Sequence, residues 1–87
     1  MVGGLPARTV NGFAVDPTTA QVMYVAMREG LFKSTDAGQR WTALRRGPRN
    51  VAAVAVNSRR PAEVYAASVE GVIHRSRDGG QTWARQK

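Results

Sequence analysis

The sequence of 87 residues has no cysteine, one histidine and only six acidic residues. Without cysteine, disulfides cannot support a small core, and thiolate zinc sites and thiol catalysis are excluded. The single histidine, His74, excludes a multi-histidine metal site within one chain. No stretch approaches the roughly 20 apolar residues of a membrane-spanning helix. The first six residues lack the basic and apolar regions of a signal peptide. We therefore expect no metal and no cofactor.

Size and charge constrain the chain further. A chain of this length buries only about 60% of the surface that its unfolded form exposes, so its core is thin. Thirteen basic residues, eleven of them arginine, give a net charge of +7. That surplus permits a nucleic acid, an anionic lipid or an acidic polysaccharide as partner. The basic residues are scattered and form no single run, which is also typical of a solvated surface.

Two parts of the chain repeat one another. Residues 34–41 and 76–83 both read Ser-x-Asp-x-Gly-x-x-Trp, at an offset of 42 residues. Upstream the offset is 41, and the matching pairs include Ala14 with Ala55, Tyr24 with Tyr65, and Gly30 with Gly71. Nearly the whole chain is therefore two copies of a unit of about 41 residues, a period typical of propeller blades.

Each unit contains four short runs of strand-forming residues. They are residues 12–15, 22–27, 31–34 and 40–44 in the first unit, and 53–56, 64–68, 72–76 and 82–85 in the second. The runs are rich in Val, Tyr, Phe and Trp and are separated by turn residues. No segment keeps a helical period, so no substantial helix is predicted. The extra residue of the second unit, at Ile73-His74, predicts a β-bulge.

Folding accounts for every residue type in the Ser-x-Asp-x-Gly-x-x-Trp segment. Glycine supplies a positive φ in the loop, and the aspartate accepts hydrogen bonds from backbone N–H groups. The serine hydroxyl satisfies further loop groups, and the tryptophan ring is buried against the hairpin and the next blade. The residues predicted to be structural are Ser34, Asp36, Gly38, Trp41, Ser76, Asp78, Gly80 and Trp83.

The two segments resemble Asp-box repeats, also called BNR repeats. These occur in blades of sialidases, xyloglucanase-type glycoside hydrolases, sortilin-like receptors and photosystem II assembly factors of the Ycf48 kind. The resemblance covers residues 9–85 and includes the Val15-Asp16-Pro17 turn. It implies an all-β fold of two four-stranded antiparallel blades, an incomplete propeller. It also implies that Asp36 and Asp78 lie on the face opposite the active site. An extracytoplasmic location fits the resemblance, but the sequence itself leaves the compartment open.

The predicted organisation is a connector-like leader at 1–8, one blade at 9–45 and a second at 46–87. Two blades do not close a propeller, which typically has four to eight. The chain is therefore a piece of a longer array, a subunit of a ring made from several copies, or an open pair. The connector-like character of residues 3–11 favours the first of these.

Four arginines are candidates for an anion-binding rim. They are Arg28, Arg45, Arg46 and Arg49. Three belong to the connector between blades and the first to the turn between the second and third strands, and in propellers these loops share the ligand face. Guanidinium groups suit carboxylate, sulfate or phosphate. The alternative is a solvated connector. Arg59 and Arg60 are predicted on the opposite face, and such a split of the basic residues argues against nucleic-acid binding.

No catalytic residue is predicted. Glu29 and Glu70 recur at one repeat position, and glycosidases use a pair of carboxylates, but repeat-equivalent residues usually recur for structural reasons. The leading prediction is a non-catalytic scaffold, part of a β-propeller, that binds a protein or a glycan. The alternative is a fragment of a sialidase- or xyloglucanase-like glycoside hydrolase whose catalytic residues lie outside this chain. A third reading is a self-assembling module whose partner is another copy.

Overall fold

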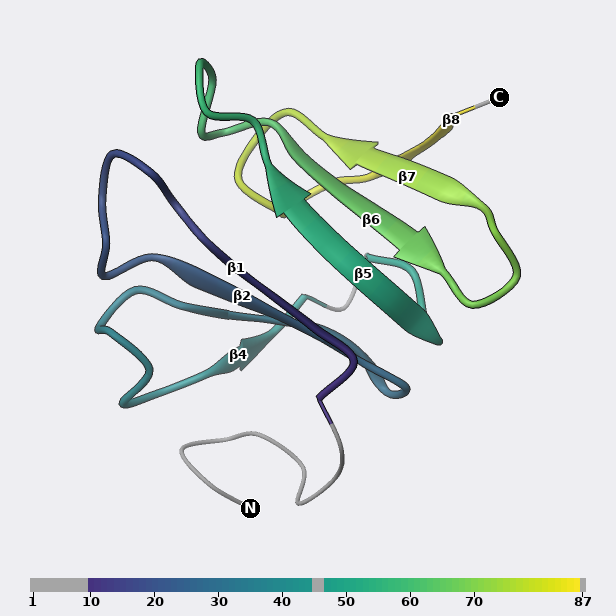
Figure 1. Ribbon diagram of the computed structural model, residues 1–87, viewed down its shortest axis with the longest axis horizontal. Coiled ribbons are helices and arrows are strands. Elements are labelled where there is room, and N and C mark those ends of the chain that lie inside the picture. The colour runs from purple at the N-terminus through teal and green to yellow at the C-terminus, as the bar shows by residue number, and fades with distance from the viewer. Residues whose placement is uncertain (1–9, 45–46, 87) are drawn as a thin grey trace.

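The computed structural model describes residues 10–44 and 47–86, which form two four-stranded antiparallel sheets (Figure 1). The first contains β1 (Gly12–Val15), β2 (Met23–Met27), β3 (Gly30–Ser34) and β4 (Thr42–Ala43), and the second contains β5 (Val51–Val56), β6 (Val64–Ser68), β7 (Ile73–Ser76) and β8 (Ala84–Gln86). In each sheet the strand order follows the chain. The predicted all-β class with two four-stranded sheets is therefore confirmed. No helix that could span a membrane occurs in the described segments.

The last strand of each sheet is shorter than the sequence predicts. β4 contains only Thr42 and Ala43, although residues 40–44 were expected to be extended. The preceding loop holds the first two of those residues, because the backbone N–H of Arg40 donates to Asp36 and the indole N–H of Trp41 donates to the Gly38 carbonyl. Loop hydrogen bonds thus replace the start of the strand.

The extra residue of the second unit lies in a turn and not in a strand. β6 and β7 pair without interruption from Ala67↔Ile73 to Val64↔Ser76, so the predicted bulge at Ile73-His74 is wrong. The insertion is absorbed by the three-residue turn 69–71, which the Ser68 N–H closes by donating to the Val72 carbonyl at 2.9 Å. Gly71 gives this turn a φ of 88°. The register shift of the second sheet occurs instead in β5, between Val51 and Ala53.

The core of the molecule lies between the two sheets. Ala26 and Leu31 of the first sheet are buried against Val51 and Ala66 of the second, and Trp83 packs on this cluster. β1 and β5 run close together there, and a Cβ on Gly12 would lie only 3.1 Å from the Cα of Ala53. Small residues at this crossing therefore let the sheets approach.

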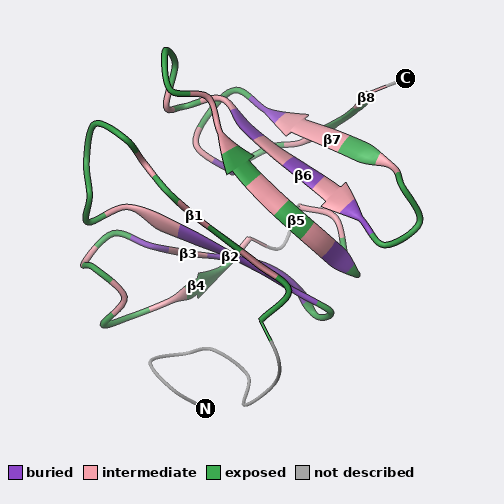
Figure 2. Ribbon diagram, viewed as in Figure 1, coloured by how far each residue is buried: buried purple, intermediate pink, exposed green. Residues whose placement is uncertain are grey.

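The outward faces of the two sheets differ in burial. On the first sheet, Val25, Met27 and Phe32 are buried in a second cluster, with Trp41 packed against it. Figure 2 shows β2 as mostly buried, whereas exposed and less exposed residues alternate along β5. The second sheet thus keeps one exposed, largely apolar face.

Candidate functional site

The first Ser-x-Asp-x-Gly-x-x-Trp loop is held by its own side chains. The Ser34 hydroxyl donates to Asp36 at 2.8 Å and accepts from the Gly38 N–H at 2.9 Å. Asp36 in turn accepts from the backbone N–H of Arg40 at 2.9 Å, and this bond, with that from Ser34, holds the pKa of the carboxyl below its usual value. The loop closes where the Trp41 indole N–H donates to the Gly38 carbonyl at 3.0 Å.

The second loop repeats this geometry with more contacts. Ser76 donates to Asp78 at 2.7 Å and accepts from the Gly80 N–H at 2.8 Å. Asp78 accepts from both the hydroxyl and the backbone N–H of Thr82, which hold its pKa well below the usual value. The Trp83 indole N–H donates to the Gly80 carbonyl at 2.9 Å. Both carboxylates are therefore engaged in shaping loops, which leaves them poorly suited to proton transfer.

The indole hydrogen bonds and one inter-sheet contact are features that sequence reasoning missed. Lys33 donates to the Gly79 carbonyl at 2.9 Å, and the hydroxyl of Tyr24 reaches the same oxygen at 3.3 Å. The Lys33 ammonium also lies 5.4 Å from the centroid of the Tyr24 ring. Two side chains of the first sheet thus hydrogen-bond to the Ser-x-Asp-x-Gly-x-x-Trp loop of the second. The recurrence of tyrosine at positions 24 and 65 was no guide to this contact, because the Tyr65 hydroxyl donates to Glu63 instead.

The connector joins the turns at one end of both sheets. The N–H of Asn50 donates to the Arg28 carbonyl at 2.9 Å, and its carbonyl accepts from the Val69 N–H at 2.8 Å. Asn50 adopts a positive φ of 52°, a conformation that asparagine tolerates better than most residues. One connector residue therefore fixes the β2–β3 and β6–β7 turns relative to each other.

An open hollow of about 700 Å³ lies at this end, lined by Arg28, Glu29, Arg49 and Asn50. Arg28 and Arg49, which are distant in sequence, are both exposed there. The other two members of the predicted rim, Arg45 and Arg46, lie outside the described residues. A second hollow of about 290 Å³ shares Glu29 and Arg49 and adds apolar side chains. Its apolar lining includes Leu31, Phe32, Leu44 and Pro48. The two hollows thus combine two guanidinium groups, the Glu29 carboxylate and an apolar wall.

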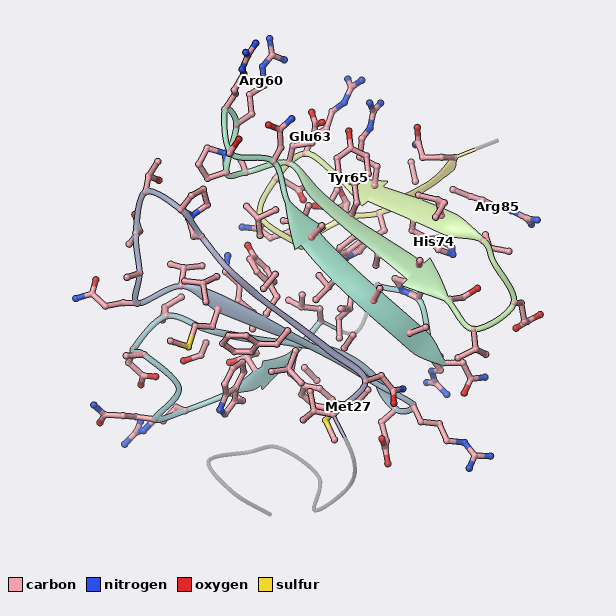
Figure 3. The ribbon with its side chains drawn as sticks, in the orientation of Figure 1. Met27, Arg60, Glu63, Tyr65, His74 and Arg85 are labelled. Atoms are coloured by element: carbon pink, nitrogen blue, oxygen red, sulfur yellow. The ribbon has the colours of Figure 1, made fainter. Side chains whose placement is uncertain are left out.

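The other arginine pair lies at the opposite end of the second sheet. Arg59 and Arg60 belong to the loop between β5 and β6, and Figure 3 shows Arg60 projecting from its tip. The second Asp-box loop, at residues 76–83, lies beside this loop, because the Gly79 N–H donates to the Ala62 carbonyl at 2.9 Å. The described pairs Arg28/Arg49 and Arg59/Arg60 therefore do not share one surface.

The remaining titratable candidates of the described residues come from separate elements. Glu29 lies in the β2–β3 turn and Glu70 in the β6–β7 turn, whereas half-buried His74 lies within β7. Among the described residues no three His, Asp or Glu side chains gather as a metal site would require. Sequence reasoning also missed Glu63, which accepts from the hydroxyl of Tyr65 and, at 3.2 Å, from Asn57. These bonds lower the pKa of Glu63.

Comparison with known proteins places the fold. No family model and no curated protein matches the sequence. Solved structures do: the GH74 xyloglucanase from Xanthomonas campestris matches 84% of this chain with a TM-score of 0.75 and 21% identity. An ancestral GH74 enzyme matches 98% with a TM-score of 0.85 and 19% identity. YCF48 from Cyanidioschyzon merolae matches 98% with a TM-score of 0.72 and 20% identity.

These likenesses show the fold of propeller blades. They confirm, at that level, the predicted resemblance to xyloglucanase-type and Ycf48-type blades. The chain spans only 14%, 13% and 26% of the length of the three matched proteins. Its two sheets therefore correspond to a small part of a propeller.

Proposed function

We propose that this pair of propeller-type blades is a non-catalytic binding module that takes an acidic group of a protein or glycan in the hollow between Arg28 and Arg49. The observation that carries the proposal is that two arginines from different loops line one open hollow of about 700 Å³. A guanidinium group binds carboxylate, sulfate or phosphate through paired N–H donors. The adjoining apolar lining gives a ligand a second surface to contact.

The position of the hollow supports a binding role. Asn50, which lines the hollow, makes backbone hydrogen bonds to both neighbouring turns. The two arginines therefore extend from a fixed backbone frame. A fixed frame lowers the entropy lost when a ligand binds. The carboxylates of Asp36 and Asp78, by contrast, are occupied within their loops.

The test compares two double variants with the same change in net charge. Arg28→Ser/Arg49→Ser removes the proposed contacts, whereas Arg59→Ser/Arg60→Ser removes two arginines from the opposite end. Binding to a sialylated glycan is measured by calorimetry, together with the salt concentration that elutes each protein from heparin. We expect the first variant to lose about tenfold or more in affinity, because hydrogen bonds to charged groups contribute about 1.5–3 kcal/mol. Equal losses in both variants would show a general effect of charge and refute the site.

A second candidate function is a part of a glycoside hydrolase whose catalytic residues lie outside this chain. The likeness to an ancestral GH74 enzyme, with a TM-score of 0.85, favours it. Such a part would bind neutral xyloglucan. That binding should persist in Arg28→Ser/Arg49→Ser and in high salt, which screens exposed charges. The first function would be favoured if the unaltered chain binds acidic ligands but not xyloglucan, and if Arg28→Ser/Arg49→Ser loses that binding.

A further inference from the structure

A chemically reactive dipeptide lies where the two sheets meet. Asn11 directly precedes Gly12, the first residue of β1, and is exposed to water. The backbone nitrogen that follows an asparagine can attack the side-chain amide, and glycine leaves this nitrogen unhindered because it has no Cβ. β1 and β5 begin at the same end of the molecule (Figure 1), and Asn11 bonds to Val51 at the start of β5. A reactive sequence therefore occupies the junction between the sheets.

Hydrogen bonds to both sheets hold Asn11 in place. Its backbone N–H donates to the Ala26 carbonyl of β2 at 2.8 Å. Its side-chain amide donates to the Val51 carbonyl of β5 at 3.0 Å. β5 shifts its register directly after Val51, so the Asn11 amide bonds to the second sheet where the regular ladder is interrupted. Asparagine at this position thus ties the first sheet to the second.

Glycine at position 12 has a separate structural cause. A Cβ on Gly12 would lie 3.1 Å from Cα of Ala53 and 3.3 Å from the carbonyl oxygen of Ala52. Both are backbone atoms, which cannot move aside as the end of a flexible side chain can. The close approach of the sheets therefore favours glycine, and the bond to Val51 needs a side chain with an N–H donor. Packing and hydrogen bonding together produce the reactive Asn-Gly sequence.

We propose that Asn11 is a deamidation site that reacts when the two sheets separate. In the reaction the Gly12 nitrogen forms a bond to Cγ of Asn11, and the bond from Cγ to the side-chain nitrogen breaks. The proton of the Gly12 N–H leaves with that nitrogen as ammonia. Water then opens the succinimide ring at either carbonyl and leaves aspartate or isoaspartate. Water is the one co-reactant, and the reaction is independent of ligand binding at the connector end.

The folded state opposes this reaction, because ring closure needs Cγ of Asn11 to turn toward the Gly12 nitrogen. Rotation of the side chain breaks its bond to Val51. That bond is also lost whenever β1 separates from β5, and proteins undergo such local opening with a free energy at or below that of global unfolding. The rate of deamidation should therefore follow the fraction of molecules in which the sheets are apart.

The product weakens the junction at which it forms. An aspartate carboxyl has an unperturbed pKa of about 3.9, so it is ionised at neutral pH and only accepts hydrogen bonds. It would replace the N–H donor that lies 3.0 Å from the Val51 carbonyl, so that two acceptors face each other. Isoaspartate also adds a carbon to the main chain directly before Gly12, where the sheets leave little space. A separation that ends in deamidation thus leaves a permanently weakened contact.

The rate is measured on the full 87-residue chain at neutral pH, with and without urea at a concentration that unfolds it. Mass spectrometry of the digested chain quantifies aspartate and isoaspartate at position 11. We expect the reaction to be about tenfold or more faster in the unfolded chain, because an opening free energy of about 1.4 kcal/mol already gives that factor. A free peptide of residues 10–15 in both buffers measures the effect of urea on the chemistry itself. Equal rates after this correction, or no product at Asn11 in the unfolded chain, overturn the proposal.

The consequence for the junction is measured as the urea midpoint of Asn11→Asp. Gln21→Glu is the matched control, because it makes the same change from amide to carboxylate in the exposed turn between β1 and β2. Asn11→Asp should have a lower midpoint than Gln21→Glu and the unaltered chain, and equal midpoints for the two variants overturn the proposal. Asn11→Ala loses the donor without gaining a charge and should lie between Asn11→Asp and the unaltered chain. If Asn11→Asp does not fold, an unchanged midpoint in Asn11→Ala overturns the proposal instead.

Discussion

Ala37 occupies a backbone position that the second repeat fills with glycine. Its φ is 61°, compared with 72° at Gly79, and the following glycines also have positive φ. A side chain in this left-handed region costs roughly 1–2 kcal/mol because Cβ crowds the following carbonyl oxygen. The first loop therefore contains backbone strain that the second avoids.

Relieving this strain should stabilise the protein. We expect Ala37→Gly to raise the free energy of unfolding by about 0.5–1 kcal/mol, since the flexibility of glycine in the unfolded chain offsets part of the gain. The measurement is the midpoint of urea unfolding followed by circular dichroism. Gly79→Ala introduces the strain at the matching position and should lower the midpoint, and its Cβ, 3.0 Å from Lys33 Nζ, adds to that loss. A lower midpoint for Ala37→Gly would contradict the assigned strain.

At the scale of elements, the Asp-box loop of the second sheet is an inter-sheet contact as well as a turn. A Cβ on Gly80 would lie 2.8 Å from Cδ1 of Leu44, which packs on the core between the sheets. Gly71 has a similar positive φ, but a Cβ there would meet nothing within 4 Å. A comparison of substitutions at the two glycines therefore separates the cost of backbone strain from the cost of overpacking.

Alanine at these two positions should have unequal effects. Gly71→Ala should lower the free energy of unfolding by about 1–2 kcal/mol through backbone strain alone. Gly80→Ala should cost about 1–3 kcal/mol more, because overpacking against Leu44 adds to the strain. Urea unfolding of the two variants measures the difference. Equal losses would show that Leu44 moves aside freely and that this contact contributes little.

The elements were predictable where repetition and turn chemistry agree. β1 and β6 begin and end at the residues that the sequence indicates, because turn residues bound them on both sides. β4 was overestimated because loop hydrogen bonds to Asp36 and Gly38 cannot be read from strand propensity. The misplaced bulge has a related cause: an insertion can be located in the sequence only to within a few residues, and the three-residue turn absorbs it.

The connector end could be predicted in outline only. The resemblance to propeller blades implied that Arg28 and Arg49 lie on one face, and both line the same hollow. It gave no indication of Asn50, since the bridging bonds use its backbone atoms. It also missed Glu63, because the pairing of Tyr65 and Asn57 around one carboxylate depends on strand register.

At the scale of the whole molecule, the two sheets should unfold together. Their common core contains residues from both sheets, and the Lys33 and Tyr24 contacts to Gly79 link them further. Because the core is shared, the free energy of folding of one sheet depends on whether the other is folded. Trp41 packs on the outward cluster of the first sheet, whereas Trp83 packs on the core between the sheets, so single-tryptophan variants report on these two places separately.

We expect one cooperative transition in both single-tryptophan variants. In Trp41→Phe the remaining fluorescence comes from Trp83, and in Trp83→Phe it comes from Trp41. Within each variant, the urea midpoint from fluorescence should coincide with that from circular dichroism, the usual test of two-state unfolding. Separate midpoints would mean that the sheets are independent units.

The bonds made by Asn50 have a consequence for how such a module can diversify. The connector end owes its shape to main-chain atoms, because Asn50 joins the Arg28 and Val69 backbones without using either side chain. Arg28, Arg49 and Val69 are all exposed, so their identities are not constrained by the core. If this end binds a ligand as proposed, substitutions there can alter which ligand is bound while the architecture persists, so that selectivity and stability evolve as separate traits.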